Sequence, residues 1–130
     1  MKIDYELLAK KATAVKENSY SPYSNYKVGC ALLTKGGKIY TGVNVENAIY
    51  KSTCAEVSAL NTAVTAGERE FVALAVSGGD GESYVLPCGV CRQILYEFNP
   101  EMEIVSVINN GKYEIKILKD LLPHAFTIKK

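Results

Sequence analysis

The spacing of apolar residues changes repeatedly along the chain, and each change predicts a new element. Over residues 5–18 the apolar positions lie near helical spacing, and Asp4 is placed to cap the first turn. Two nearly continuous apolar runs, 27–34 and 71–77, predict strands that are buried on both faces. The glycines within 35–38 predict a hairpin turn after the first of these strands.

Helices and strands are expected to alternate after this hairpin. Thr53 is placed to cap a second helix that runs to about Ala66 and is ended by Gly67. The other expected elements are a strand at 38–45, a loop at 78–81, a helix at about 89–98, strands at 103–108 and 113–117 on either side of a turn at 109–111, and a short terminal helix at 119–122. Because buried parallel strands need helices over both faces, the pattern predicts an α/β fold, a three-layer α/β/α sandwich with a mixed five-stranded sheet, in a single domain over residues 1–130.

The composition narrows the functions that such a fold can serve. Hydrophobic residues make up 48% of the chain and charged residues 22%, and the formal net charge of +1 gives no electrostatic footprint for a nucleic acid polymer or an anionic membrane. If the substrate is nucleotide-like, a small nucleoside is therefore favoured. No apolar run approaches the roughly 20 residues of a membrane span, and the N-terminal residues lack an apolar signal-peptide centre. We therefore expect a cytoplasmic protein, whose four cysteines serve as metal ligands or buried thiols rather than as disulfides.

Three of these cysteines are candidates for chemistry. Cys54 stands at the start of the second expected helix, and Cys88 and Cys91 stand at the start of the third. A helix N-terminus offers unpaired N–H groups and a positive dipole end, and both lower the pKa of a thiol. If the two helix starts face one point, we expect a pre-ionised thiolate cluster. Three protein ligands leave a tetrahedral zinc ion with one position for water, which is typical of catalytic rather than structural zinc.

Glu56 lies two residues after Cys54, close enough to reach a zinc-bound water without being a ligand. Zinc lowers the pKa of that water toward about 7, and a neighbouring carboxylate can accept the proton and pass it on. Two other uses of the Cys-x-x-Cys motif remain. One is a redox dithiol, and the other is a structural zinc site with Cys30 or His124 as fourth ligand. The mid-strand position of Cys30 favours a buried structural thiol instead.

The segments Cys54-Ala55-Glu56 and Pro87-Cys88-Gly89-Val90-Cys91 together resemble the zinc signature of the cytidine deaminase superfamily. The resemblance covers nearly the whole chain, because the segments at 20–29, 42–48 and 121–126 also resemble family motifs. It implies a small homotetrameric cytidine deaminase of pyrimidine salvage, with active sites shared between subunits, rather than an editor of polynucleotides.

The resemblance also implies a role for each matching residue. One zinc ion per chain would be bound by Cys54, Cys88 and Cys91. Glu56 would shuttle protons while zinc-bound hydroxide attacks C4 of cytosine, which converts cytidine or deoxycytidine to uridine or deoxyuridine. The substrate contacts would be made by Tyr26 against the pyrimidine, Asn44 and Glu46 at the ribose hydroxyls, the Ala55 backbone at the base, and Phe126 in a neighbouring subunit's pocket. The alternatives are a turn-forming role for Asn44 and core packing for Phe126.

Two departures from the family pattern concern charge and substrate. Val57 stands where many members have an arginine that offsets the thiolate charge. Three thiolates and one Zn²⁺ sum to a net charge of −1, and we expect Arg92 and the two helix N-termini to compensate it. An intersubunit salt bridge is the alternative role for Arg92. The segment 48–53, beside the expected nucleoside pocket, is about one residue shorter than in common members.

These departures keep a second deaminase function open, and a non-enzymatic function stands beside it. A blasticidin-S deaminase uses the same chemistry on a cytosine nucleoside antibiotic, but such enzymes tend not to keep the full ribose motif that Asn44 and Glu46 supply here. A zinc-stabilised binding module without turnover is the non-enzymatic alternative. Glu56 argues against it, since a structural site does not need a free carboxylate.

Overall fold

Five strands form one mixed sheet in the computed structural model, which describes residues 1–81, 84–108 and 111–128. The strand order is β2-β1-β3-β4-β5, and only β3 and β4 pair in parallel among these neighbours. The strands are β1 at Val28–Thr34, β2 at Ile39–Val43, β3 at Phe71–Gly78, β4 at Glu103–Val107 and β5 at Tyr113–Ile117. The helices are α1 at Tyr5–Val15, α2 at Ala55–Thr65 and α3 at Gly89–Tyr96.

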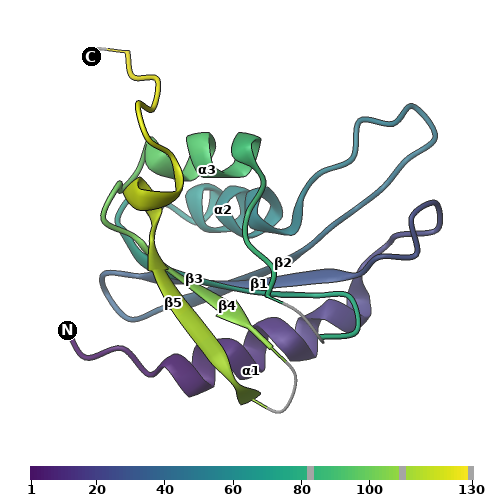
Figure 1. Cartoon of the computed structure of the whole chain (residues 1–130), viewed down its shortest axis with the longest axis horizontal. Coiled ribbons are helices and arrows are strands. Elements are labelled where there is room, and N and C mark those ends of the chain that lie inside the picture. The colour runs from purple at the N-terminus through teal and green to yellow at the C-terminus, as the bar shows by residue number, and fades with distance from the viewer. Residues whose placement is uncertain (82–83, 109–110, 129–130) are drawn as a thin grey trace.

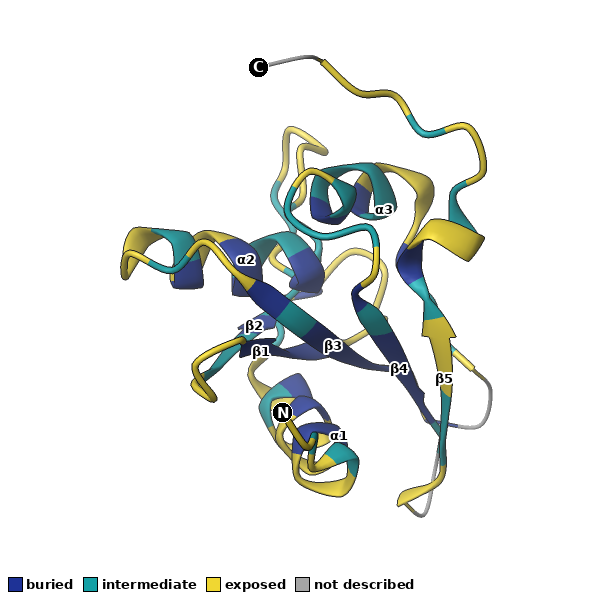
Figure 2. Cartoon of the chain, turned by 90° about the vertical axis from the view of Figure 1, so that its left-hand side faces the viewer, coloured by how far each residue is buried: buried dark blue, intermediate teal, exposed yellow. Residues whose placement is uncertain are grey.

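The helices cover both faces of this sheet (Figure 1). α1 lies against one face, and α2 and α3 lie against the other. Neighbouring residues of β1 therefore enter different cores: Cys30 and Leu32 pack with α2, whereas Ala31 and Leu33 pack with α1. This explains why the sequence of β1 is continuously apolar rather than alternating, since neither of its faces meets water. Figure 2 shows the buried strands between the helical layers. The predicted three-layer sandwich with a mixed sheet is confirmed.

The beginning of α2 differs from the prediction. Thr53 is not the cap, because its backbone pairs with Val45 in both directions, with N–O distances of 2.9 and 3.0 Å. This bridge holds Thr53 outside the helix, and Cys54 becomes the N-cap. Gly42 of β2 lets the helix approach the sheet, since a Cβ there would lie 2.3 Å from the backbone nitrogen of Ala59. The same packing fixes where the first turn of α2 lies.

Other boundaries differ by a few residues. Asp4 caps α1 as predicted, accepting a hydrogen bond from the Leu7 N–H at 3.0 Å. A 3₁₀ turn at Lys16–Asn18 follows α1, and another at Leu118–Leu121 replaces the predicted terminal helix. The turn expected at 109–111 falls mostly on residues outside the described ones. In the described part of the chain, no helix is long and apolar enough to cross a membrane.

Candidate active site

Cys54, Cys88 and Cys91 come together at the N-terminal ends of α2 and α3, and their Sγ atoms all lie within 4.8 Å of one another. Cys54 and Cys88 are the N-caps of the two helices, each with an extended backbone. Their carbonyls accept the first helical hydrogen bonds, from the N–H groups of Ser58 at 3.0 Å and Arg92 at 2.9 Å. The Cys54 thiol makes no side-chain capping bond, and the Cys88 thiol accepts from backbone N–H groups of the first turn of α3, so both sulfur atoms can still serve as ligands.

The donor set fits zinc. Sulfur ligands suit this borderline-soft ion, and a tetrahedral site with bonds of about 2.3 Å places its sulfur atoms roughly 3.8 Å apart, which is compatible with the observed cluster. The cluster found among the described residues contains neither Cys30 nor His124. Cys30 is fully buried in β1, as predicted for a structural thiol. Since no fourth protein ligand joins the cluster in the described part of the chain, the site has the composition of a catalytic zinc centre.

The expected pre-ionised cluster is wrong for two of the three thiols. Burial raises the pKa of Cys54 and raises the pKa of Cys91 further. At Cys88 burial acts in the same direction, but hydrogen bonds, led by that from the Cys91 N–H, bring the thiol pKa below its usual value. Because thiolate is the form that binds zinc, ligation has to displace protons from Cys54 and Cys91.

Glu56 lies in the first turn of α2 and is only 5% exposed. Burial raises the pKa of its carboxyl group, because the charged form loses its hydration. Glu56 and two ligands, Cys54 and Cys88, line a cavity of about 210 Å³. The same cavity is lined by four of the residues expected at the substrate: Tyr26, Asn44, Glu46 and Ala55. A carboxyl group whose pKa is raised by burial therefore faces the same space as the metal ligands.

Asn44 has a structural role in the segments around the cavity. Its Oδ1 accepts hydrogen bonds from the Val28 N–H at 2.9 Å and from the Ser19 hydroxyl. Its Nδ2 donates to the Tyr26 carbonyl at 2.8 Å. These bonds use one of the two N–H groups of the side-chain amide. The second N–H group is not used in the described contacts, so it can donate to a ligand. Asn44 thus shapes the chain around the cavity and also lines it, and its contact with the ribose stays a prediction.

Glu46 is held by the loop that precedes β1. Its Oε1 accepts from the N–H groups of Tyr23 at 3.0 Å and Ser24 at 3.1 Å, and its Oε2 accepts from the Ser24 hydroxyl. The hydrogen bond from that hydroxyl is the main reason that the pKa of Glu46 is lowered. A neighbouring cavity of about 310 Å³ shares Glu46 and also includes Tyr50 and Tyr23, whose rings meet edge to face with centroids 6.0 Å apart.

Arg92 donates from Nε to the Pro87 carbonyl at 2.6 Å and from a terminal nitrogen to the Leu121 carbonyl at 2.8 Å. Pro87 directly precedes Cys88, so the guanidinium group is fixed beside the segment that carries a ligand. Both bonds lie within one chain. Neither bond goes to a sulfur atom. They are compatible with the expected charge compensation, which would come from the position of the guanidinium group beside the cysteine segment.

Phe126 does not line the cavity of its own chain, and its side chain is 67% exposed. Core packing is therefore wrong for this residue. Gln93 holds its backbone instead: Gln93 Nε2 donates to the Phe126 carbonyl at 2.7 Å, and the Phe126 N–H donates to Gln93 Oε1 at 3.1 Å. Sequence reasoning missed Gln93, because a polar residue on a helix gives no sign of a partner 33 positions away.

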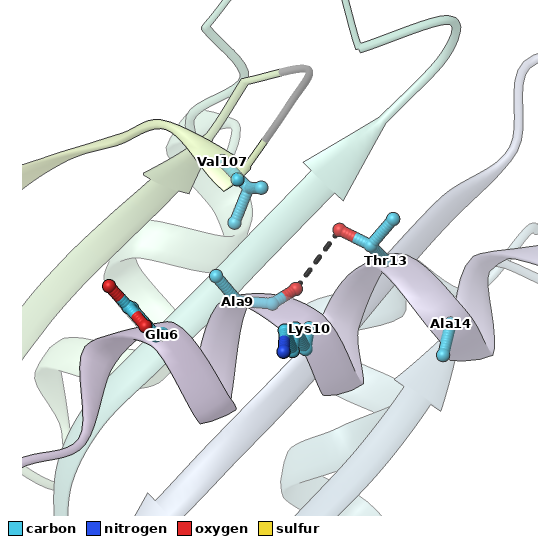
Figure 3. A pocket seen from close by; sticks show the side chains of 7 residues that line it. Glu6, Ala9, Lys10, Thr13, Ala14 and Val107 are labelled. Atoms are coloured by element: carbon cyan, nitrogen blue, oxygen red, sulfur yellow. Dashed lines mark hydrogen bonds between the residues drawn. The ribbon is translucent and has the colours of Figure 1, made fainter.

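Another cavity, of about 580 Å³, lies between α1 and the end of β4 (Figure 3). It is on the other side of the sheet from the cysteines, and none of its lining residues was predicted to be functional. The Thr13 hydroxyl in this cavity donates to the Ala9 carbonyl at 3.0 Å. The same hydroxyl lies 3.3 Å from Ser77 Oγ of β3, and the described residues that line the cavity include no comparable set of reactive groups.

The fold and the cysteine site together define a zinc-dependent catalytic domain. The model of the cytidine and deoxycytidylate deaminase zinc-binding region matches residues 2–107 of the chain. A cytidine deaminase from Sporosarcina psychrophila is 43% identical over 127 residues, which cover 96% of this chain and 93% of that protein. A crystal structure of cytidine deaminase from Burkholderia pseudomallei aligns with a TM-score of 0.88 and 44% identity, over 95% of this chain and 100% of that one.

A crystal structure of cytidine deaminase from Mycobacterium tuberculosis aligns with a TM-score of 0.86 and 36% identity, over 98% of this chain and 100% of that one. The chain belongs to the cytidine and deoxycytidylate deaminase family, and Cys54, Cys88 and Cys91 form its zinc site.

Proposed function

We propose that the protein is a cytidine deaminase that hydrolyses the exocyclic amino group of cytidine and deoxycytidine. The observation that carries this proposal is the position of Glu56, which is buried and lines one small cavity together with Cys54 and Cys88, two of the three metal-binding thiols. Support also comes from the names of the relatives, which match this chain over nearly their whole length. The products are uridine or deoxyuridine and ammonia, which fits a role in pyrimidine salvage.

Zinc held by Cys54, Cys88 and Cys91 would act as a Lewis acid that lowers the pKa of a water molecule toward about 7. The Glu56 carboxylate accepts a proton from the attacking water and delivers it to N3 of cytosine, which makes C4 more electrophilic. Glu56 then carries the second proton of the water to the amino group, and the C4–N bond breaks as ammonia leaves. Glu56 returns to its starting form, and the water oxygen becomes the C4 carbonyl of the product.

The remaining cavity residues bind and orient the nucleoside. Asn44 and Glu46 hydrogen-bond the ribose hydroxyls, with Asn44 using its second amide N–H and Glu46 accepting as a carboxylate. Tyr26 forms a wall against the pyrimidine, and the Ala55 backbone contacts the base. The buried position of Ala55 and Glu56 keeps bulk water away from the reacting atoms, so the charges act in a medium of low dielectric.

Arg92 and the helix N-termini offset the negative charge of the cluster in this proposal, because Val57 cannot. The working assembly is a homotetramer in which Phe126 completes the pocket of a neighbouring subunit. Its exposed side chain and clamped backbone support this, since a phenylalanine held out into solvent lacks apolar contacts of its own. We place the protein in the cytoplasm, where a reducing environment keeps the zinc-binding thiols reduced.

The proposal is tested by metal analysis and a deamination panel on one purified sample. We expect about one zinc ion per chain and loss of aminopyrimidine absorbance with cytidine and deoxycytidine. Blasticidin S at the same concentration is the discriminating substrate: turnover of blasticidin S alone would replace the proposal with the antibiotic deaminase. Zinc without turnover of any cytosine nucleoside would instead leave a binding module.

A further inference from the structure

Lys16 is a buried lysine that the proposed chemistry does not use. It lies in the 3₁₀ turn after α1, and only 8% of its surface is exposed. Its Nζ donates a hydrogen bond to the Gly79 carbonyl at 3.0 Å, just beyond the end of β3. Lysine is rarely buried without a partner, because its ammonium group loses hydration. The partner here is the Gly79 carbonyl, which accepts a charge-assisted hydrogen bond from the Lys16 ammonium group.

Gly78 and Gly79 form the surface against which Tyr26 lies. Gly79 has a φ of +61°, and a Cβ there would come within 2.7 Å of Tyr26 Cε1. A Cβ on Gly78 would lie 2.8 Å from the Tyr26 hydroxyl and 2.9 Å from a methyl group of Val85. Tyr26 and Val85 both line the cavity that contains Glu56. The position of this glycine pair therefore determines how far two side chains reach into the cavity.

Two adjacent glycines have wide backbone freedom, so their position needs external bonds. The Gly79 N–H donates to the Lys27 carbonyl at 2.8 Å, and the Gly79 carbonyl accepts from Lys16. The backbone of Tyr26 is fixed separately, because its N–H donates to Ser24 Oγ at 3.0 Å and its carbonyl accepts from Asn44. What remains to be fixed is the direction of the Tyr26 ring.

We propose that Lys16 is a positioning residue for the substrate cavity. Its ammonium group holds the Gly78–Gly79 backbone in place, and that backbone sets the Tyr26 ring as the wall of the pyrimidine site. Lys16 thus connects the α1 layer, on one face of the sheet, to a cavity formed at the other. The assignment of the wall to the pyrimidine rests on the proposed deaminase function, whereas the mechanical link from Lys16 to Gly79 does not.

The first test replaces Lys16 with methionine, which keeps an unbranched stem and removes the donor. Methionine leaves the Gly79 carbonyl without this donor, so some loss of stability is expected whatever the role of Lys16. A purely structural role predicts no change in KM for the folded variant. We expect the KM for cytidine to rise about fivefold, the size of one lost hydrogen bond, with kcat within about twofold. Lys11→Met, at an exposed position of α1, is the matched control and should leave both constants unchanged. An unchanged KM in K16M overturns the proposal.

The second test does not depend on activity. Amide hydrogen exchange at Gly79, followed by NMR, reports the bond from its N–H to Lys27. We expect exchange at Gly79 to accelerate by about tenfold in K16M and to stay unchanged in K11M. If the wild-type protein deaminates no nucleoside, the proposed function fails but this measurement still decides the role of Lys16. Unchanged exchange at Gly79 overturns that role.

A double-mutant cycle of Gly78→Ala and Tyr26→Phe covers the case in which K16M does not fold. The Cβ of G78A meets the Tyr26 hydroxyl, so G78A should raise KM and lower the unfolding temperature. Y26F removes that hydroxyl, so adding it to G78A should recover part of both losses, beyond the effect of Y26F alone. Additive effects of the two substitutions would show that the ring does not lie against Gly78 and would overturn the proposal.

Discussion

Cys54 and Cys88 are the N-caps of α2 and α3, and their thiols lie in one cluster at the two helix starts. The N-terminal N–H groups of both helices therefore lie beside a cluster whose sulfur atoms are within 4.8 Å of one another. Negative charge on the sulfurs stabilises these helix ends, since the positive ends of both dipoles point toward it. Zinc binding, which converts the thiols to thiolates, should consequently stabilise the fold as well as supply the chemistry.

Zinc removal is expected to destabilise the protein. A chelator should lower the unfolding temperature, because metal that binds the native chain adds to its stability by mass action. Cys88→Ser should lose most of its zinc and show a correspondingly small response to the chelator. Cys30→Ala is the matched control, since Cys30 is buried outside the cluster: it should keep its zinc and its full response. Metal analysis and thermal unfolding of the same samples provide the measurement, and full zinc content in C88S would contradict the ligand assignment.

Glu56→Gln is expected to lower kcat by roughly 100-fold to 10,000-fold, the usual contribution of a group that transfers protons in the transition state. The amide keeps the size of the side chain and removes its ability to accept a proton, so zinc content should stay near one per chain. Glu70→Gln, at an exposed position outside the cavity, should leave kcat unchanged. Steady-state kinetics and metal analysis separate the outcomes, and near-normal turnover in E56Q would show that another group moves the protons.

The parts of this site that could be predicted are those that local sequence determines. Cys54 and Cys88 stand at helix starts that the apolar spacing located to within one residue, and Glu56 follows at a fixed helical offset. The pKa values of the thiols were not predictable in the same way, because burial of Cys54 and Cys91 depends on packing between elements. Burial is the largest cause of the raised pKa at both residues.

Contacts between distant residues were also beyond sequence reasoning. Lys16 and Gly79 are 63 positions apart, and neither looks unusual within its own segment. The helix start at Thr53 was misplaced for a related reason, since its backbone pairs with Val45 on a different segment. A threonine before a helical pattern is a good local cap signal, but a backbone bridge to another part of the chain took precedence.

Arg92→Gln is expected to weaken zinc retention by about 10-fold to 100-fold, in the range found when residues behind metal ligands are removed. The substitution removes the charge and the hydrogen bond to the Pro87 carbonyl, next to Cys88. Arg92→Lys keeps the positive charge but lacks the planar guanidinium group, so it separates the effect of charge from that of hydrogen-bond geometry. If R92K retains zinc as the wild-type protein does, the charge is what matters. Competition with a chromogenic chelator measures retention.

Arg69→Gln is the matched control for that experiment. Arg69 also donates to backbone carbonyls, those of Val64 and Glu68, but it lies beyond the C-terminal end of α2, whereas the cysteines lie at the N-terminal end. R69Q should hold zinc as the wild-type protein does. If R92Q also does so, the proposed compensation at the cluster is wrong, and the guanidinium group of Arg92 serves only to hold the Leu121 segment.

Phe126→Trp tests whether this side chain enters a neighbouring subunit. The chain contains no tryptophan, so the substitution introduces a single tryptophan, which can be excited selectively, at a position that is 67% exposed within one chain. If Phe126 completes a partner's pocket, F126W should emit at shorter wavelength in the assembled protein and shift to longer wavelength as dilution separates the subunits. Adding Gln93→Ala removes the two bonds that hold its backbone and should weaken this burial. Light scattering on the same samples reports assembly, and solvent-exposed emission from an intact tetramer would exclude Phe126 from the shared site.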